Sequence, residues 1–323
     1  MAKLLDKYWG FFRRVKPAYH IFNMSKRALL QRNKELYKQY GLKKSVYAPI
    51  SSADFKSLPD ERPWSDDSTD IRQQAGFDQL DPKVKDAIAE TWVDGGYAIL
   101  RGYFSEEFID NTNAEIDRLM EDGTIDFNYS GKKIMFAYRQ GELMGKIARD
   151  KGIVDAFKFL LGKNMVPFQS INFFKSSEQR AHSDSIHMTT YPLGYLTAAW
   201  VALEDIGPDQ GPLQYWPGSH KFPYVLNDTF DHGGNSLLLG KDAYLHYEEY
   251  IQKMVAERGI KPETLYPKKG DVFLWHGNLI HGAIKMNDPS LTRKSMVVHY
   301  MSPEVICYHE ITQRPALIEF DNA

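Results

Sequence analysis

The chain has 323 residues, of which 43% are hydrophobic and 25% are charged, and its formal net charge at pH 7 is -2. This composition is typical of a folded protein with a substantial core and excludes an intrinsically disordered chain. The single cysteine, Cys307, excludes an internal disulfide and a cysteine cluster for zinc or iron–sulfur. No apolar stretch approaches the roughly 18 residues of a membrane-spanning helix. We therefore expect one main domain in the cytoplasm, with neither a signal peptide nor a membrane span.

Residues 1–47 form a basic segment, in which 12 lysines and arginines face two acidic residues, a local charge of +10 that leaves -12 on the remainder. Aromatic side chains are interleaved with these charges, at Trp9, Phe11, Phe12, Tyr19 and Phe22. Such a segment either forms helices docked on the acidic body of the same chain or meets an anionic membrane or an acidic partner. We expect the docked helices, because charge runs are usually solvated faces.

The stretch 51–70, SSADFKSLPDERPWSDDSTD, is rich in Ser, Asp and Pro and is typical of a linker or an irregular arm. The chain therefore divides into a basic helical arm with its linker, 1–70, and a main domain, 71–323. The main domain begins with a predicted helix that has Asp81 near its start and ends at Gly95 and Gly96, followed by a short strand, YAILRGYF.

A second helix is predicted after Ser105, which is a good N-cap residue, and its apolar stripe includes Ile109 and Ile116. A further helical stretch covers roughly 140–162. From residue 164 the pattern changes to short β-like runs, among them LTAAWVALED, GPLQYWPGS, GDVFLWHGNLIHGA and TRKSMVVHYMS. An insertion at 222–265 contains a helix that is predicted to be capped by Asp242 and to end at Gly259. This order predicts an α+β chain whose mainly β core is a double-stranded β-helix of the jelly-roll, cupin-like kind.

Two histidines flank an aspartate in HSDSIH, residues 182–187. Residues i and i+2 of a β-strand project to the same face, so we expect His182 and Asp184 to converge. His187 lies on the opposite face if the strand continues, and it joins the pair only if the chain turns. The pair is an imidazole and a carboxylate, which together need a third ligand to hold a metal ion.

The best third ligand is His281, which lies between Gly277 and Gly282, two residues that allow close approach of another backbone. His276 is five residues earlier and faces the other side. Two histidines and one carboxylate leave up to three coordination positions open, which suits a non-haem Fe(II) that also binds a bidentate co-substrate and O₂. A closed structural zinc site would take a fourth protein ligand.

Arg293 follows His281 after the turn-like sequence KMNDPS. We expect an antiparallel hairpin to place Arg293 beside the metal, where its guanidinium can pair with a carboxylate bidentately. 2-Oxoglutarate carries such a carboxylate at the end opposite its chelating keto acid. The four residues together predict a site for Fe(II) and 2-oxoglutarate.

The run HSDSIHMTTYPLGYLTAAWVALEDIGPDQGPLQYWPGSHK and the downstream run GDVFLWHGNLIHGAIKMNDPSLTRKSMVVHYMS resemble the phytanoyl-CoA dioxygenase family of Fe(II)/2-oxoglutarate oxygenases. GGYAILRGYFSEEFIDNTNAEIDRLM resembles the entry segment of that family, so the likeness covers approximately residues 77–303. The resemblance implies a double-stranded β-helix, with iron on His182, Asp184 and His281 and with 2-oxoglutarate bound by Arg293.

The same resemblance implies that Trp200 lines the co-substrate pocket. It also implies that Gln169 is a polar co-substrate contact, as in the related ectoine hydroxylases. Two positions after the second histidine, where relatives often have a small hydroxyl residue, this chain has Ala283. The resemblance covers neither the basic arm nor the insertion.

We therefore expect an Fe(II)- and 2-oxoglutarate-dependent dioxygenase that uses O₂ to hydroxylate a small organic or lipid-like substrate, with release of succinate and CO₂. His187 is either a substrate contact or a pocket residue, and His299 is expected in the core. Tyrosines 244, 247 and 250 either pack their helix or form a lid. Two other classes stay open, a non-catalytic β-helix module that binds a ligand or metal and a zinc-dependent hydrolase. We expect no nucleic-acid partner.

Overall fold

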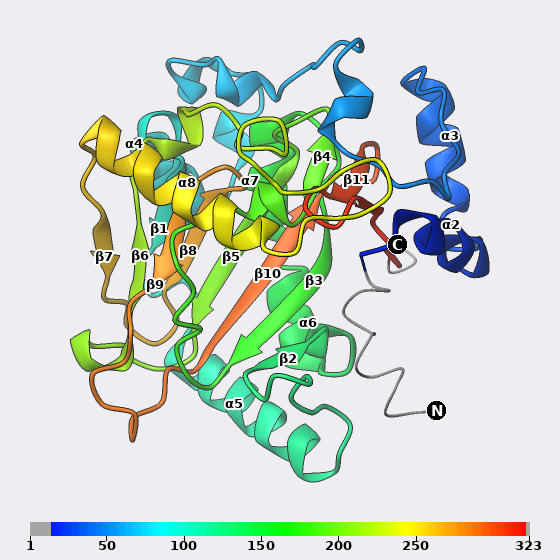
Figure 1. Cartoon of the computed structure of the whole chain (residues 1–323). Helices are drawn as coiled ribbons and strands as arrows, with labels where there is room; N and C mark the ends of the chain where they lie inside the picture. The colour runs from blue at the N-terminus through cyan, green and yellow to red at the C-terminus, as the bar shows by residue number, and fades with distance from the viewer. Residues whose placement is uncertain (1–13, 321–323) are drawn as a thin grey trace.

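The computed structural model describes residues 14–320 (Figure 1). The first part of the basic arm, with Trp9, Phe11 and Phe12, therefore lies outside the described residues. No helix in the described part is long and apolar enough to cross a membrane.

The largest sheet has six antiparallel strands, and it forms one wall of the site discussed below. Two three-stranded antiparallel sheets accompany it. This arrangement confirms the expected α+β fold with a double-stranded β-helix. The order in the large sheet is β1 (Tyr97–Leu100), β8 (Val272–His276), β5 (Leu196–Ala202), β10 (Ser295–Met301), β3 (Val166–Phe173) and β2 (Lys133–Met135). One small sheet has the order β7 (Glu263–Leu265), β6 (Leu213–Tyr215) and β9 (His281–Ala283). The other has the order β12 (Arg314–Pro315), β11 (Ile306–His309) and β4 (Thr189–Tyr191).

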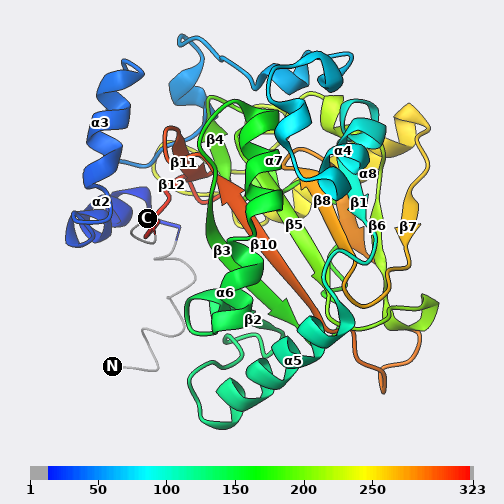
Figure 2. The ribbon, with the colours of Figure 1, turned by 180° about the vertical axis from the view of Figure 1, so that it is seen from behind.

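Four helices cover the back of the large sheet, as seen in Figure 2. The predicted cap at Ser105 is confirmed, because its side chain accepts the Phe108 N–H. Asp81, expected near the start of the first helix, also caps it by accepting the Lys83 N–H. The stretch expected to be helical over roughly 140–162 consists of two helices, because Asp150 caps a new helix by accepting the Ile153 N–H. The four are α4 (Pro82–Gly95), α5 (Glu106–Glu121), α6 (Glu142–Ala148) and α7 (Lys151–Leu161).

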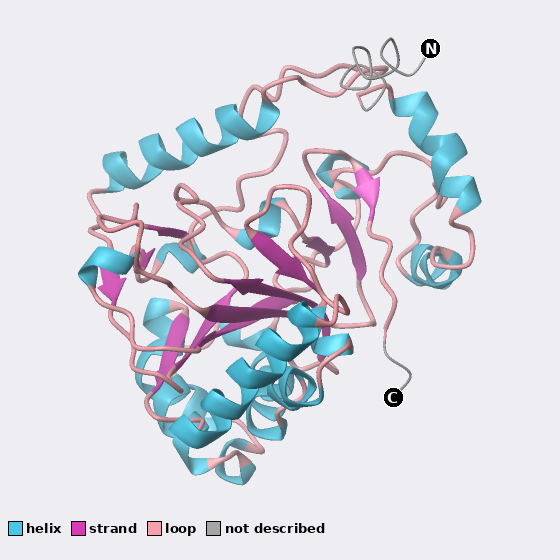
Figure 3. Cartoon of the chain, turned by 90° about the horizontal axis from the view of Figure 1, so that it is seen from below, coloured by secondary structure: helices cyan, strands magenta, loops and turns pink. Residues whose placement is uncertain are grey.

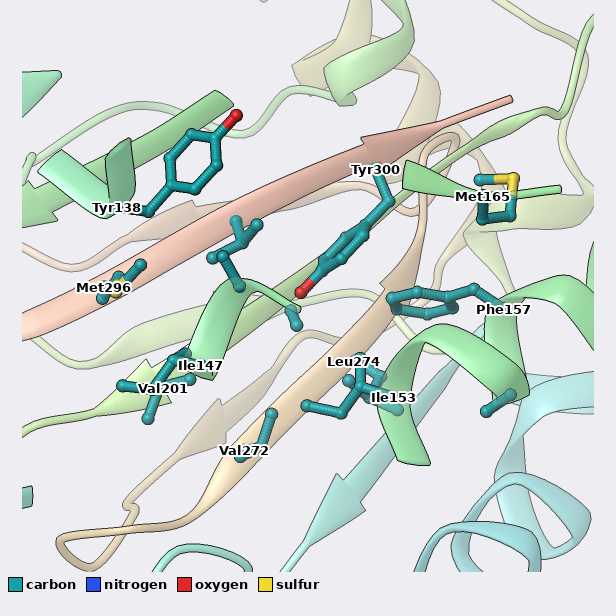
Figure 4. Close-up of a cluster of buried hydrophobic side chains, with 14 of the residues drawn as sticks. Tyr138, Ile147, Ile153, Phe157, Met165, Val201, Val272, Leu274, Met296 and Tyr300 are labelled. Carbon is teal, nitrogen blue, oxygen red and sulfur yellow. The ribbon is translucent and has the colours of Figure 1, made fainter. Parts of the chain in front are cut away.

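Side chains of the large sheet alternate between two cores, as the two-residue period of a strand requires. In β8, Val272 and Leu274 pack with the helices, whereas Phe273 and Trp275 face the interior of the β-sandwich. Figure 4 shows the helix-side cluster, in which Val272 and Leu274 lie with side chains of α6 and α7. The face of the large sheet toward the sandwich interior does not pack on the helices and is therefore available for the side chains of a functional site.

The described part of the arm is docked on the body of the chain, as expected. It contains α2 (Lys16–Ser25) and α3 (Gln31–Gln39), and Leu30 and Tyr37 are buried in a cluster with Tyr191 and Ile306. The segment expected as a linker also packs, because the Phe55 ring stacks on Tyr191 with centroids 4.2 Å apart. The boundary at residue 70 stays a prediction.

The insertion contains α8 (Ala243–Arg258), which ends at Gly259 in the left-handed conformation, as predicted. The predicted cap at Asp242 is wrong, because Asp242 precedes the helix but its side chain makes no capping hydrogen bond. Figure 3 shows the strands between the helical layer on one side and α8 on the other. The loop before α8 contacts the arm, because Arg14 and Leu239 exchange hydrogen bonds. The insertion thus links the arm to the front of the sandwich.

Substitution of Leu30 tests the docking of the arm. Leu30 is fully buried, whereas Ile21 on α2 is 73% exposed. We expect Leu30→Ala to lower the free energy of unfolding by about 2–4 kcal/mol, because it leaves a cavity. Ile21→Ala should change it by less than about 0.5 kcal/mol. Urea titration measures both, and an effect of Leu30→Ala as small as that of Ile21→Ala would contradict the docked arm.

Candidate active site

The two histidines predicted as ligands are joined through their backbones. His182 and His281 form an isolated antiparallel bridge in which each N–H donates to the other carbonyl at 2.9 Å. Paired residues of antiparallel strands project to the same side, and the ring centroids lie 4.5 Å apart. Gly282 permits this approach, since a Cβ there would lie 2.9 Å from the carbonyl oxygen of Gln179.

Asp184 lies beside the histidines as predicted, but the alternation of side chains along a strand is not the reason. The chain leaves the extended conformation at Asp184, which begins a 3₁₀ turn over Asp184–Ile186. Its Oδ1 lies 3.9 Å from Nε2 of His182 and 3.7 Å from Nε2 of His281. All three side chains are buried, and one ligand atom from each lies within 4.8 Å of the others. A turn rather than strand alternation therefore assembles the triad.

Each histidine is oriented by a carbonyl two residues before it. Nδ1 of His182 lies 2.8 Å from the oxygen of Arg180, and Nδ1 of His281 lies 3.0 Å from that of Leu279. A carbonyl can only accept, so Nδ1 carries the proton and the lone pair of Nε2 faces Asp184. Burial, with the neighbouring His281, lowers the pKa of His182 to about 3. The ring is therefore neutral, which is the form that binds a metal.

The second oxygen of Asp184 is held by side chains of the large sheet. Trp275 donates its indole N–H to Oδ2 at 2.8 Å, and Nε2 of His299 lies 3.5 Å from the same atom. In the sheet register Ala198 lies between these two residues, and its small side chain leaves room for the carboxylate. Burial alone would raise the pKa of Asp184, but the imidazoles of His281 and His299 hold it below its usual range. Oδ1 remains available to a cation.

No sequence motif pointed to Trp275, and His299 was assigned only to the core. His299 is buried as expected, but its imidazole faces a proposed metal ligand. The one available signal was the even spacing between Arg293 and His299 along a strand. Neighbouring strands had to be aligned before either residue could be placed beside Asp184.

The expected hairpin between the His281 and Arg293 segments is wrong. β9 pairs with β6, whereas β10 pairs with β3 and β5 in the large sheet. Arg293 precedes β10, and its backbone N–H donates to the carbonyl of Phe174 at 2.8 Å. Its guanidinium lies 5.3 Å from the centre of the Trp200 ring. The structure therefore brings Arg293 to the site across the sandwich.

Arg293 is 2% exposed, and its Nε has no hydrogen-bond partner. Within residues 14–320 no carboxylate forms an ion pair with its guanidinium. Burial lowers its pKa to about 10, so it remains a cation at neutral pH. An unpaired buried charge is costly, and an anionic ligand would remove that cost.

A cavity of about 80 Å³ connects the triad with Arg293 and Trp200. A second cation, Lys133 of β2, also lines it, with Nζ 5.8 Å from the centre of the Phe173 ring. Burial lowers the pKa of Lys133. Lys133 lies in a three-residue strand without a motif, so the sequence offered no reason to select it. The other lining residues are Ile171, Phe173, Ser177, Gln179, Leu213, Trp275, Gly282, Ala283, Val297 and His299.

Gln169 is not among the residues that line this cavity. Strand alternation puts it on the same face of β3 as Ile171 and Phe173, opposite His299 in the register. Its role as a co-substrate contact stays a prediction. His276 faces away from the triad, as expected, and its Nε2 lies 3.4 Å from Asp66.

The turn at Asp184 brings His187 back toward the triad. Its ring centroid lies 6.0 Å from that of His182, 4.9 Å from that of Tyr244 and 5.4 Å from that of His309. The insertion also contacts the metal motif, since the hydroxyl of Tyr247 accepts the backbone N–H of Ser183 at 2.9 Å. Two tyrosines of α8 therefore contact the segment that carries the metal motif.

Residues 92–287 match the model of the phytanoyl-CoA dioxygenase (PhyH) family, which is more than half of the chain. The chain belongs to the phytanoyl-CoA dioxygenase family. Among its relatives is an ectoine dioxygenase of Sphingopyxis alaskensis, 27% identical over 68% of this chain and 72% of the relative. Another is the mouse phytanoyl-CoA dioxygenase domain-containing protein 1, 28% identical over 46% of this chain and 49% of the relative. The match to the mouse protein thus spans about half of its length.

Solved structures show the same fold as this family member. The non-haem α-ketoglutarate-dependent carbocyclase SnoK from nogalamycin biosynthesis has a TM-score of 0.55 at 16% identity, over 79% of this chain and 99% of that chain. The epimerase SnoN, solved with Fe³⁺, α-ketoglutarate and a nogalamycin compound, has a TM-score of 0.52 at 20% identity, over 69% and 85%. At these identities the likeness supports the fold alone.

Replacement of Trp275 tests whether its hydrogen bond orients Asp184. We expect Trp275→Phe to lower the affinity for Co(II), a probe of the iron site, by about tenfold, because partners of a ligand typically contribute that much. Trp92→Phe is the matched control, since Trp92 is equally buried but lies in the helix-side cluster. Equilibrium Co(II) titration measures both, and equal affinities in the two variants would contradict the assignment.

Proposed function

We propose that this protein is an Fe(II)- and 2-oxoglutarate-dependent dioxygenase that hydroxylates a small organic substrate. The observation that carries this proposal is the unpaired, buried guanidinium of Arg293 in one cavity with an open His182, Asp184 and His281 triad. Membership of the phytanoyl-CoA dioxygenase family supports the reaction class. Iron with 2-oxoglutarate and O₂ supplies the oxidation of a substrate C–H bond, with release of succinate and CO₂.

The donor set fits ferrous iron. Two neutral imidazole nitrogens and one carboxylate oxygen are the facial ligands of non-haem iron oxygenases. Within the described ranges the clustered metal-binding side chains are these three, which is one fewer than a closed structural zinc site takes. The hydrogen bonds at Nδ1 of each histidine and at Oδ2 of Asp184 hold the ligands in place before a metal binds.

The rest of the cavity fits a dicarboxylate. Arg293 would pair with one carboxylate through its planar fork, and Lys133 would supply a second positive charge. Trp200 fixes the guanidinium by stacking, and Leu213 and Val297 offer apolar surface to the methylene carbons. Arg293 would neutralise the carboxylate at one end, and the keto acid at the other end would chelate the iron, with Lys133 adding positive charge to the same cavity.

The substrate would approach on the side of α8. His187 lies there beside His182, and we assign it to substrate contact. Helix α8 contacts the motif segment through Tyr244 and Tyr247, and a substrate bound beside it would be less exposed to water, which would favour its oxidation over side reactions. The names of the ectoine dioxygenases support a small soluble substrate. A zinc-dependent hydrolase or a non-catalytic module would leave Arg293 without a role.

Variants of Arg293 and Asp184 test the proposed reaction. We expect Arg293→Gln to raise the KM for 2-oxoglutarate at least tenfold, because a charge-assisted contact contributes about 1.5–3 kcal/mol. Asp184→Ala should abolish succinate release, and Arg118→Gln, on the exposed surface of α5, should leave it unchanged. Succinate is measured with Fe(II) and with Zn(II). Release supported equally by Zn(II), or retained in Asp184→Ala, would exclude the proposal.

We also propose that α2 contacts an anionic membrane surface. Ile21, Phe22 and Met24 are 73%, 45% and 53% exposed, and the exposed Lys26 and Arg27 follow them. Apolar side chains beside basic ones are typical of helices that bind lipid headgroups. We expect replacement of the three apolar residues by serine to weaken binding to phosphatidylglycerol vesicles at least tenfold in a sedimentation assay. Unchanged binding would exclude this role, and neutral phosphatidylcholine vesicles serve as the control.

A further inference from the structure

A second guanidinium in the structure also lacks an anion, although it is only half-buried. Arg314 belongs to β12 and pairs with His309 of β11. Its guanidinium carbon lies 3.9 Å from the centre of the Tyr19 ring of α2, and its Nε is buried without a hydrogen-bond partner. In the part of the chain that the structure describes, no carboxylate forms an ion pair with Arg314. Stacking on an aromatic ring leaves the edge of a guanidinium free to bind an anion.

A row of side chains joins Arg314 to the metal ligands. The ring of His309, its β-sheet partner, lies 5.4 Å from that of His187, which lies 6.0 Å from that of His182. Arg293 precedes β10, whereas His309 and Arg314 come after the other end of this strand. The two guanidinium groups therefore approach the triad from different directions. A 2-oxoglutarate molecule bound to Arg293 would therefore not need the guanidinium of Arg314 as well.

The nearest acidic residue in sequence is already paired elsewhere. Glu310 accepts hydrogen bonds from the hydroxyl and the N–H of Ser52, at 2.6 and 2.9 Å, and from the N–H of Asn227 at 3.0 Å. Glu310 follows the last residue of β11 and begins the turn to β12, and its carboxylate faces Ser52 and Asn227. Its charge is therefore satisfied without Arg314.

The two histidines in the row are neutral hydrogen-bonding groups. Burial, with the charge of Arg314, lowers the pKa of His309 to about 4, and burial with His309 lowers the pKa of His187. Nδ1 of His309 accepts the N–H of Thr312 at 3.3 Å, so its Nε2 carries the proton and can donate. Arg314 is then the fixed positive charge of the row, and His309 is a donor beside it.

We infer that His187, His309 and Arg314 form a binding site for an anionic group of the primary substrate, a carboxylate or a phosphate. This inference rests on the proposed function, because the triad would hold the iron that oxidises the substrate. The anion would bind to Arg314 and His309, and His187 would contact the part of the substrate between the anion and the reacting carbon. The substrate is therefore a small anionic molecule. Its charged group and its reacting carbon are separated by about the space that the rings of His187 and His309 span.

The test uses probes that share one chain and differ in their head group. Hexanoate, hexyl phosphate and 1-hexanol are titrated into the full chain loaded with Co(II) and 2-oxoglutarate. Broadening of probe proton signals by Co(II) reports both binding and proximity to the triad. We expect at least one anionic probe to bind tenfold more tightly than hexanol, and the comparison of the two anions identifies the preferred group.

Three variants test whether Arg314 causes the preference for an anionic probe over hexanol. Arg314→Gln should weaken binding of the anionic probe at least tenfold and leave hexanol unchanged, whereas Arg314→Lys should keep part of the preference. Tyr19→Leu keeps the charge, so it should keep the affinity for the anion. The matched control is Arg118→Gln. Melting temperatures show that each variant is folded.

Two outcomes would overturn the site. One is an anionic probe that binds no more tightly than hexanol, or equally well to Arg314→Gln. The other is a loss in Tyr19→Leu as large as in Arg314→Gln, since this would make Arg314 a packing residue of the arm. Failure of the proposed function is distinguishable, because it would appear as an absence of Co(II) or 2-oxoglutarate binding by the wild-type protein.

Discussion

One pair of backbone hydrogen bonds supports the whole site. The bridge between His182 and His281 joins the turn that contains Asp184 to strand β9, and without it the two imidazoles would have no fixed distance. The bridge depends on Gly282, because any side chain there would collide with the carbonyl of Gln179. Residues separated by about 100 positions in the chain thereby become neighbours whose ring centroids lie 4.5 Å apart.

The large sheet positions the other side chains of the site, which the bridge does not hold. Strand alternation sends Trp275 and His299 toward the carboxylate of Asp184, and Trp200 toward the guanidinium of Arg293. The same alternation fills the opposite face with apolar side chains that pack on the helices. The buried Nε of Arg293 and Nδ1 of His299 both lack a hydrogen-bond partner and belong to residues that line one cavity, where a ligand would provide partners.

The sequence predicted those features that local chemistry determines. Capping residues fixed the starts of α4 and α5, and β-like runs located most strands of the sandwich. The pairing of the strands was predicted less well. The turn-like residues after β9 are typical of a hairpin, yet consecutive strands of a jelly roll often lie in different sheets, as β9 and β10 do. Lys133, Trp275 and Arg314 belong to no motif, and only sheet register places them near the triad.

The central claim is that His182, Asp184 and His281 bind one ferrous ion while Arg293 binds the carboxylate of 2-oxoglutarate. Anomalous diffraction at the iron absorption edge, from crystals grown without oxygen with Fe(II) and 2-oxoglutarate, tests it most directly. The account predicts one iron peak within bonding distance of Nε2 of both histidines and of Oδ1 of Asp184, with a ligand carboxylate on Arg293. An iron bound without His281, or a ligand that leaves Arg293 unpaired, would contradict it.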